Sequence, residues 1–462
     1  MTTTKRISLL LLGGWGLLGL AGCEKLIDID PPLNEVPSEL VFRSDATARS
    51  AMSGAYASLS TSQAFALSLT LNGALSADEL VSNRTNLDYL TTNQLDPLLS
   101  SQATSLWGDI YACIYRFNAI IKGLDNNTAV SANLRRQYTA EARFMRAYCY
   151  FYLVNYFGDV PLVLDTDVTV TNQLPRAPAA SVYAQLVQDL QAAQADLPAD
   201  YSASPGLRTN ANRWAATALL ARAALYTSDW ATAERSATDV LGQTTLYSLP
   251  PGASLRNVFL RNSSEAILQL GPYQSLGNFT YEGFTFATTA ANYSLRPELY
   301  NSFEATDLRR STWTRPLAPG QQLYKYRFDG TAAGTAAGQL EYPTVLRLAE
   351  QYLIRAEARA QQNNLAGALQ DLNVLRQRAG LPPLTATTTA TQAAVLLAVE
   401  AERRHELFGE LGHRWFDLKR TGRATPVLGA LKPATWQPTD VLYPVPQAAI
   451  DANPNLTQNP GY

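Results

Sequence analysis

The strongest constraint on the fold is a helical pattern that occurs twice. Residues 212–226 and 345–361 each carry an apolar stripe at helical spacing, and each is followed by a short polar break and a second helical pattern. A shift of 135 positions (356 − 221) superimposes the two units, so that Ala221 meets Ala356. One helix pair cannot bury its own apolar face, and the repeat therefore predicts helix pairs that stack on one another.

The repeated unit resembles the tetratricopeptide helix pair. We expect an all-α body, a tetratricopeptide-like helix-pair superhelix, with helix pairs near 141–241 and 345–420. Residues 141–157 add a helical pattern with apolar residues on several faces, which predicts deep burial, and Gly158 supplies its stop signal.

Residues 244–340 lose the helical period and are rich in Gly, Thr, Asn and Tyr. We expect loops and short strands there, in a loop-rich insert. Irregular segments of this length are usually functional.

The N-terminus predicts export. Lys5 and Arg6 precede the apolar stretch 7–21, which is the order of a secretory signal. The stretch closes as Leu-Ala-Gly-Cys and resembles the bacterial lipobox, in which Cys23 would be diacylated; the alternative is an ordinary signal peptide with a chance cysteine. We expect a signal peptide over 1–22, a lipidated tether over 23–37 and a body over 38–462, attached to a membrane by acyl chains.

Composition argues against several classes of protein. The net charge of −2 does not indicate the positively charged surface that nucleic-acid binding requires. Two His and three Cys are few ligands for a transition metal. No cofactor is indicated. Cys113 and Cys149 lie in apolar helical runs, which favours free buried thiols over a bridge, although spacing alone leaves the bridge open.

Residues 141–163, 342–359, 402–420 and 442–462 carry four patterns that occur together in one known family. The chain resembles the SusD/RagB family of outer-membrane nutrient-binding lipoproteins, with one departure at Ala449, where the family often carries an acid. The resemblance makes the segment near 244–340 a loop-rich ligand-binding insert. The resemblance implies a surface lipoprotein without catalytic activity, in the outer membrane. It would capture an oligosaccharide and deliver it to a SusC-like TonB-dependent transporter. Peptide capture and a helical assembly scaffold that binds no ligand remain alternatives.

Two polar, aromatic segments are candidates for contact with a glycan, because sugar rings stack on aromatic faces and their hydroxyls pair with polar groups. They are residues 78–96 and the 271–313 part of the insert. The candidate side chains are Arg84, Asn86, Tyr89, Tyr273, Phe279, Tyr281 and Trp313. Helical patterns place Trp107, Trp214, Trp230 and Trp415 in the core instead.

Glu402, Glu406 and Glu410 share one helical face, with Arg403 and Arg414 at pairing distance along it. This pattern favours a structural charge network over the two carboxylates of a glycoside hydrolase, the weakest alternative. His405 and His413 are eight residues apart and do not match the H-E-x-x-H spacing of a zinc site, so no metal is predicted.

Overall fold

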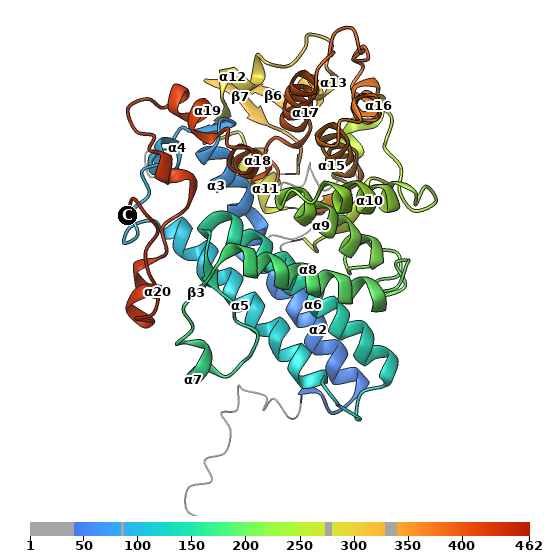
Figure 1. The fold of residues 1–462 in the computed structure, drawn as a ribbon, viewed down its shortest axis with the longest axis vertical. Coiled ribbons are helices and arrows are strands. Elements are labelled where there is room, and N and C mark those ends of the chain that lie inside the picture. Colours follow the sequence, from blue (N-terminus) through green and yellow to red (C-terminus); the bar gives the residue numbers. More distant parts are fainter. Residues whose placement is uncertain (1–40, 85–86, 273–279, 329–339) are drawn as a thin grey trace, which may run out of the picture.

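The computed structural model describes residues 41–84, 87–272, 280–328 and 340–462, and this part of the chain is mostly helical. The all-α expectation is confirmed (Figure 1). The described strands are two to four residues long and form two-stranded antiparallel sheets. The strands are β1 Leu80–Ser82, β2 Val160–Pro161, β3 Arg176–Ala177, β4 Ala266–Gln269, β5 Tyr293–Leu295, β6 Thr314–Leu317, β7 Gly320–Leu323 and β8 Thr344–Arg347.

The N-terminal half combines long helices with several of four to eight residues, and its longest helix packs against two of the other long ones (Figure 1). These helices are α2 Asp45–Thr61, η1 Ala64–Ser68 (a π-helix), α3 Leu69–Ser76, α4 Asp88–Thr92, α5 Ser101–Leu124, α6 Ala132–Phe157, α7 Val168–Thr171 and α8 Ala179–Asp196. The predicted buried helix is α6, which ends at Gly158 with a φ of 71° and packs against α5 and α8.

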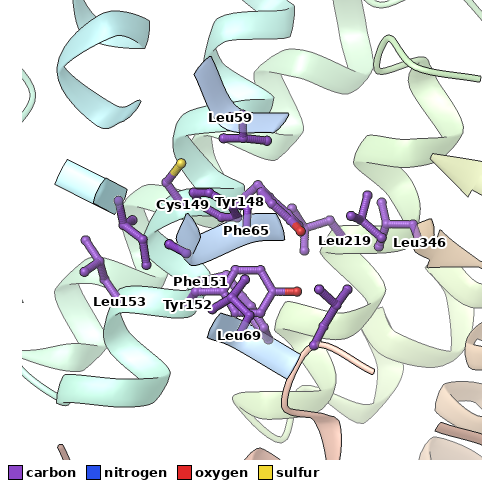
Figure 2. Packing of buried hydrophobic residues seen from close by; sticks show 14 of the residues in the cluster. Leu59, Phe65, Leu69, Tyr148, Cys149, Phe151, Tyr152, Leu153, Leu219 and Leu346 are labelled. Carbon is purple, nitrogen blue, oxygen red and sulfur yellow. The ribbon is translucent and has the colours of Figure 1, made fainter. Parts of the chain in front are cut away.

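Aromatic rings fill the interior around α6. Figure 2 shows Phe65 of η1 against Tyr148 and Tyr152 of α6, and the ring centroids of Phe65 and Tyr148 are 5.6 Å apart. Cys149 lies in the same cluster, and both Cys149 and Cys113 are buried and free. Burial raises the pKa of the Cys113 thiol to about 11, which keeps it protonated at neutral pH. No helix in the described residues is long and apolar enough to cross a membrane.

The two repeated units are helix pairs whose first helices are equal in length. The first pair is α9 Arg213–Tyr226 and α10 Trp230–Leu241, and the second is α15 Leu348–Gln361 and α16 Leu365–Arg378. The shift of 135 positions carries both ends of α9 onto those of α15, and the start of α10 onto the start of α16. α10 and α15 pack together, where Ala221, Ala233, Ala237 and Ala358 form one small cluster. The small residues of the repeat therefore do allow close approach.

The described residues of the insert, 244–272, 280–328 and 340, are more ordered than the sequence suggests. Besides β4 to β7 it contains short helices, which are η3 Gly252–Asn257 (a 3₁₀ helix), α11 Tyr281–Phe286, α12 Pro297–Tyr300 and α13 Leu308–Thr312. Its strands are tied to the body, because β4 pairs with β8 and β5 pairs with β1. The expected short strands are present, and N-cap side chains explain some of the helices: Thr280 caps α11 and Asp307 caps α13.

The C-terminal part returns to the N-terminal helices. Its helices are α17 Gln392–Leu407, α18 His413–Arg420, α19 Ala424–Leu431, η5 Pro438–Val441 (a 3₁₀ helix) and α20 Gln447–Ala452. Gly412 precedes α18 with a φ of 75° and lies against Gly73 of α3, where a Cβ on Gly73 would come 2.4 Å from the Gly412 Cα. Two glycines are therefore needed where α3 and α18 meet.

Of the tryptophans expected in the core, Trp415 is fully buried and Trp107 is 8% exposed. Trp214 and Trp230 are only half-buried, since they lie at the outer end or edge of their helix pair.

Candidate ligand-binding face

The pairing of β1 with β5 joins the two segments in which the sequence predicts ligand contacts. Ser82 is the partner of Tyr293 in this antiparallel register. Beyond β1, the Asn83 backbone N–H donates to the Asn292 carbonyl at 2.8 Å, and the Asn83 side-chain amide donates to the Ala291 carbonyl at 2.6 Å. Residues about 200 positions apart in the chain therefore lie side by side.

Arg84, Tyr89 and Tyr281 all act electrostatically on the Tyr293 phenol. Burial raises the pKa of Tyr293; the charge of Arg84 and its hydrogen bond to the phenol act in the opposite direction, and the nearby Tyr281 and Tyr89 raise the pKa further. Three of the predicted side chains therefore lie within electrostatic reach of one phenol. We define the ligand face as Arg84, Tyr89, Tyr281, Phe284 and Tyr293.

The ligand face combines exposed and supporting groups. Arg84 is exposed, Tyr89 and Tyr281 are half-buried, and Tyr293 lies beneath them at 7% exposure. Phe284 is 46% exposed, and its ring centroid is 6.1 Å from that of Tyr281 at an angle of 66°. Aromatic faces beside a guanidinium offer both apolar contact and hydrogen-bond donors, which is the combination that a sugar ring needs.

Buried contacts of Glu282 and Gly283 hold the short helix α11 in place and so orient the aromatic rings that it carries. The Thr70 hydroxyl of α3 donates to Glu282 Oε1 at 2.5 Å, and burial raises the pKa of Glu282 to about 8. Gly283 lies against the Phe328 carbonyl, where a Cβ would come 2.4 Å from the oxygen. Tyr281 and Phe284 thus project from a helix with little freedom to turn.

A hairpin supports the loop between α11 and β5. Arg315 of β6 donates through Nη2 to the carbonyls of Ala287 and Thr288, both at 2.7 Å, and through Nε to Gln322 of β7 at 2.9 Å. The loop that leads into Tyr293 is therefore held by a side chain from the neighbouring hairpin, which favours a preformed surface.

Trp313 is wrong as a ligand-contacting residue. It is fully buried, its indole N–H donates to the Leu255 carbonyl at 3.2 Å, and its ring packs against Phe259 and Phe408. The polar sequence around it reflects α13 and β6, which cover the ring. Three other predicted ligand contacts, Asn86, Tyr273 and Phe279, lie outside the described residues.

Sequence reasoning missed two members of the ligand face, Tyr293 and Phe284. Both lie in the insert segment already singled out, and Phe284 is three residues from Tyr281. An alternating run around Tyr293 could have indicated a strand. Its partner β1 could not be identified from local pattern.

The predicted carboxylate stripe is part of a buried charge network, but its three acids do not share one helix, because α17 ends at Leu407 and Glu410 lies beyond it. Glu406 is fully buried, and Arg347 Nη1 lies 2.6 Å from its Oε1 while Arg309 Nη1 lies 3.1 Å from its Oε2. Burial acts to raise the pKa of Glu406, but the charges of Arg378, Arg347 and Arg309 together hold it well below its ordinary value. Such a carboxylate stays ionised and has no surface for a substrate, so it does not supply the general acid of a hydrolase.

The predicted partners within this stripe are wrong. Arg403 Nε donates to Asp417 at 2.7 Å, and Arg414 Nε donates to Asp78 at 2.7 Å, instead of to Glu406 and Glu410. Both arginines point off the carboxylate face, toward α18 and toward the end of α3. In the described ranges no group of three or more His, Cys, Asp or Glu side chains could hold a metal ion.

Comparisons with known proteins agree with this architecture. A family model described as "SusD family" matches residues 275–462, and one described as "Starch-binding associating with outer membrane" matches residues 28–225. Two similar sequences are the SusD-like proteins P25 and P2 of Formosa agariphila, each 27% identical. The matches cover 95% of both chains for P25, and 96% of this chain and 98% of the other for P2.

Solved structures share the fold. Surface glycan-binding protein A from Bacteroides fluxus has a TM-score of 0.76 at 22% identity, and a laminarin-binding SusD-like protein has 0.77 at 23%. Each match covers 91% of this chain and all of the other chain. Together the two family models span most of the sequence, and the chain belongs to the SusD/RagB family.

Proposed function

We propose that this protein is a surface lipoprotein that captures an oligosaccharide and passes it to a partner TonB-dependent transporter in the outer membrane. The single observation that carries the capture step is the pairing of β1 with β5, which brings the segment of Arg84 and Tyr89 to Tyr293. A glycan would stack on the aromatic rings while its hydroxyls accept from Arg84. Two structural neighbours support this reading, since their names describe binding of surface glycan and of laminarin.

Attachment would come from lipidation of Cys23, followed by the tether over 23–37. The description of the matching N-terminal family model, with its reference to the outer membrane, supports this location. Replacing Cys23 with Ser should move the protein from the membrane fraction to a soluble one, because stable anchoring requires acyl chains. Retention of the Cys23→Ser protein in the membrane fraction would contradict the lipid anchor.

Capture is tested by calorimetric titration of residues 24–462 with plant, fungal and bacterial polysaccharides. We expect one glycan class to bind, and Tyr281→Ala or Tyr89→Ala to weaken it at least about tenfold, or ~1.4 kcal/mol. Tyr115→Ala is the matched control, since Tyr115 is a 49%-exposed tyrosine on α5 outside the ligand face.

Oligopeptides are titrated in parallel. A heat of binding with peptides but not with glycans would indicate peptide capture instead. Peptide binding uses backbone hydrogen bonds, and its affinity should survive the loss of any one aromatic ring. No binding to either class, together with normal import by cells that lack the protein, would contradict capture altogether and favour an assembly scaffold.

A further inference from the structure

One end of the N-terminal helices lies where the described chain begins. Figure 1 shows the start of α2, the end of α5 and the short helix α7 along the lower edge of the molecule. A cavity of about 830 Å³ joins these elements, because Val41, Lys122 of α5 and Thr166 all line it. A second cavity, of about 530 Å³, shares Lys122 and reaches Leu164 and the start of α6. We define the bundle end as residues 41–49, 115–126, 132–143 and 164–171, none of which belongs to the ligand face.

α7 exposes apolar side chains on a loop that is held at both ends. None of its residues is buried, and Val168 and Val170 are 55% and 56% exposed. Leu164, which precedes α7, is 42% exposed. The ends of the loop are nevertheless fixed, since β2 pairs with β3 and the Leu174 carbonyl accepts from the Asn453 side-chain amide at 2.9 Å. Three apolar side chains gathered on a fixed loop indicate a surface that contacts something outside this chain.

Arginines without an acidic partner line the cavities beside this loop. The lining contains five cations and three acids, which are Arg116, Lys122, Arg135, Arg136 and Arg143, and Asp125, Asp165 and Asp196. Lys122 pairs with Asp165 at 2.7 Å, but in the part of the chain that the structure describes none of the four arginines forms an ion pair. Arg136 is exposed and donates to the uncharged Asn133 side chain at 2.9 Å. The lining is therefore positive, 5 − 3 = +2, on a chain whose net charge is −2.

The residues that precede the bundle end include the proposed lipidation site. Cys23 comes 41 − 23 = 18 positions before Val41, and a chain of that length reaches at most about 60 Å. Acyl chains on Cys23 would therefore keep the bundle end close to the bilayer, at a high effective concentration, so that a weak attraction suffices for contact. Apolar side chains beside arginines suit this surface, because the first enter the boundary of headgroups and acyl chains and the second attract phosphates.

We propose that the bundle end docks on the lipid surface of the membrane, as a second contact besides the acyl chains. Val168 and Val170 enter the boundary between headgroups and acyl chains, and Arg116, Arg136 and Arg143 pair with lipid phosphates. This inference rests on the proposed lipid anchor and adds an orientation to it. Figure 1 places α11 of the ligand face in the upper half of the molecule and α7 at the lower edge, so the contact leaves the ligand face away from the lipid.

The test is co-sedimentation of residues 24–462 with vesicles of phosphatidylcholine mixed with phosphatidylglycerol, and with vesicles of phosphatidylcholine alone. We expect the anionic vesicles to bind the protein at least about tenfold more tightly, because their headgroups attract each nearby cation. No sedimentation with the anionic vesicles, or equal sedimentation with both kinds, overturns the proposal. Since residues 24–462 carry no acyl chain, neither result depends on whether Cys23 is lipidated or on whether a glycan binds.

A matched pair of variants tests the apolar part of the contact. Val170→Asp should weaken vesicle binding at least about tenfold, because a carboxylate resists transfer out of water. Leu397→Asp is the control, since Leu397 of α17 is also 56% exposed and lies outside the bundle end, and it should bind as the parent does. Melting temperatures show that both variants are folded. Unchanged vesicle binding by a folded Val170→Asp overturns the proposal.

A second pair tests the phosphate contact. Arg136→Gln should weaken binding to the anionic vesicles about fivefold and leave binding to neutral vesicles unchanged. Arg235→Gln is the control, because Arg235 is an exposed arginine of α10 that also donates to an uncharged side chain, that of Thr232, at 3.1 Å. An equal loss in both variants overturns the phosphate contact.

A protein partner is the other occupant that the experiment distinguishes. Membrane protein that copurifies with the full chain from cells is compared between the parent and Val170→Asp. We expect the same copurifying protein in both, since Val170 contacts lipid. Loss of a copurifying transporter in Val170→Asp, with vesicle binding unchanged, would assign the bundle end to the transporter and overturn the proposal.

Discussion

The helix pairs and the ligand face are built in opposite ways. In α9–α10 and α15–α16 the same helix–turn–helix pattern recurs at a shift of 135 positions. Each turn contains one residue in the left-handed conformation, Ser228 with a φ of 59° and Asn363 with a φ of 62°. The ligand face has no repeat, and it depends on β1 meeting β5 across the chain. Local periodicity fixes the scaffold, whereas long-range pairing fixes the surface, so the two should respond differently to substitution.

The largest effect is expected in the buried charge network. Arg347→Met would leave Glu265, Glu406 and Glu410 without a shared cation in an interior where each is at most 6% exposed. Arg309, Arg378 and Lys325 still pair with these acids, but loss of the central guanidinium leaves their buried charge undercompensated. We expect a loss of about 3–5 kcal/mol in the free energy of unfolding, because removing one partner of a buried charge network is strongly destabilising. Urea denaturation measures it. Affinity of the remaining folded protein for a glycan should not change, which separates the scaffold from the ligand face.

Glu234→Gln is the control for that experiment. Glu234 pairs with Arg359 at 2.9 Å but is 29% exposed, so its removal should cost less than about 1 kcal/mol. A loss of similar size in both variants would mean that burial of the network has no special role.

A smaller effect is expected where α3 meets α18. A Cβ at Gly73 would come 2.4 Å from the Gly412 Cα, so Gly73→Ala forces two backbones apart and should cost about 1–3 kcal/mol. Gly108→Ala on α5 is the matched control, because its Cβ would meet no atom within 4 Å, and it should stabilise the helix by about 0.5–1 kcal/mol. Thermal or urea unfolding of the two variants tests whether their free energies of unfolding change in opposite directions.

The support of the ligand face should depend on pH. Burial raises the pKa of Glu282 to about 8, with Glu410 and Glu341 adding to the rise and Thr70 and Lys325 opposing it. The unfolded carboxyl has its ordinary pKa near 4.5, so between pH 4.5 and 8 the folded state holds a proton that the unfolded chain releases. This group therefore stabilises the fold least at the alkaline end of that window.

Glu282→Gln keeps the size of the side chain and removes the titration. We expect the loss of stability between pH 5 and pH 8 to shrink by about 3–4 kcal/mol in this variant. Unfolding curves at several pH values measure the slope. An identical slope in the parent and in Glu282→Gln would show that another group carries the pH dependence.

More of the fold than of the site could be predicted, because the helices depend on residues that are close in the sequence whereas the site depends on residues that are far apart. Apolar spacing indicated α6 and its end at Gly158, and the repeat located both helix pairs. Spacing along α17 also indicated that its acids form a network, but it offered only partners on neighbouring turns. The partners of Glu406 are Arg309, Arg347 and Arg378, which come from three other segments.

Trp313 and Tyr293 show the same limit at the ligand face. Both are aromatic residues in the polar, irregular insert, and local sequence does not distinguish them. The structure buries Trp313 against Phe259 and Phe408 and places Tyr293 beneath Arg84. Both rings are buried, and only knowledge of which strand pairs with which would have shown that Tyr293 supports the ligand face while Trp313 does not.

The smallest expected effect tests the repeat itself. Asp229 Oδ1 accepts from the Thr232 backbone N–H at the start of α10, and Asn364 Oδ1 accepts from the Gly367 N–H at the start of α16, both at 3.1 Å. The same shift of 135 positions relates the two caps. Asp229→Ala and Asn364→Ala should each therefore cost about 1 kcal/mol, because each leaves one N–H of a first turn without its acceptor.

Unfolding of the two single variants and of the double variant measures whether the caps act alike. Because the caps lie on different helix pairs, their losses should add within about 0.5 kcal/mol. A loss at one cap only would mean that the pairs share a geometry without sharing its energetics. In that case the first pair, whose Arg222 is joined to Glu350 of α15 at 2.6 Å, would draw its stability from the neighbouring pair instead of from its own turn.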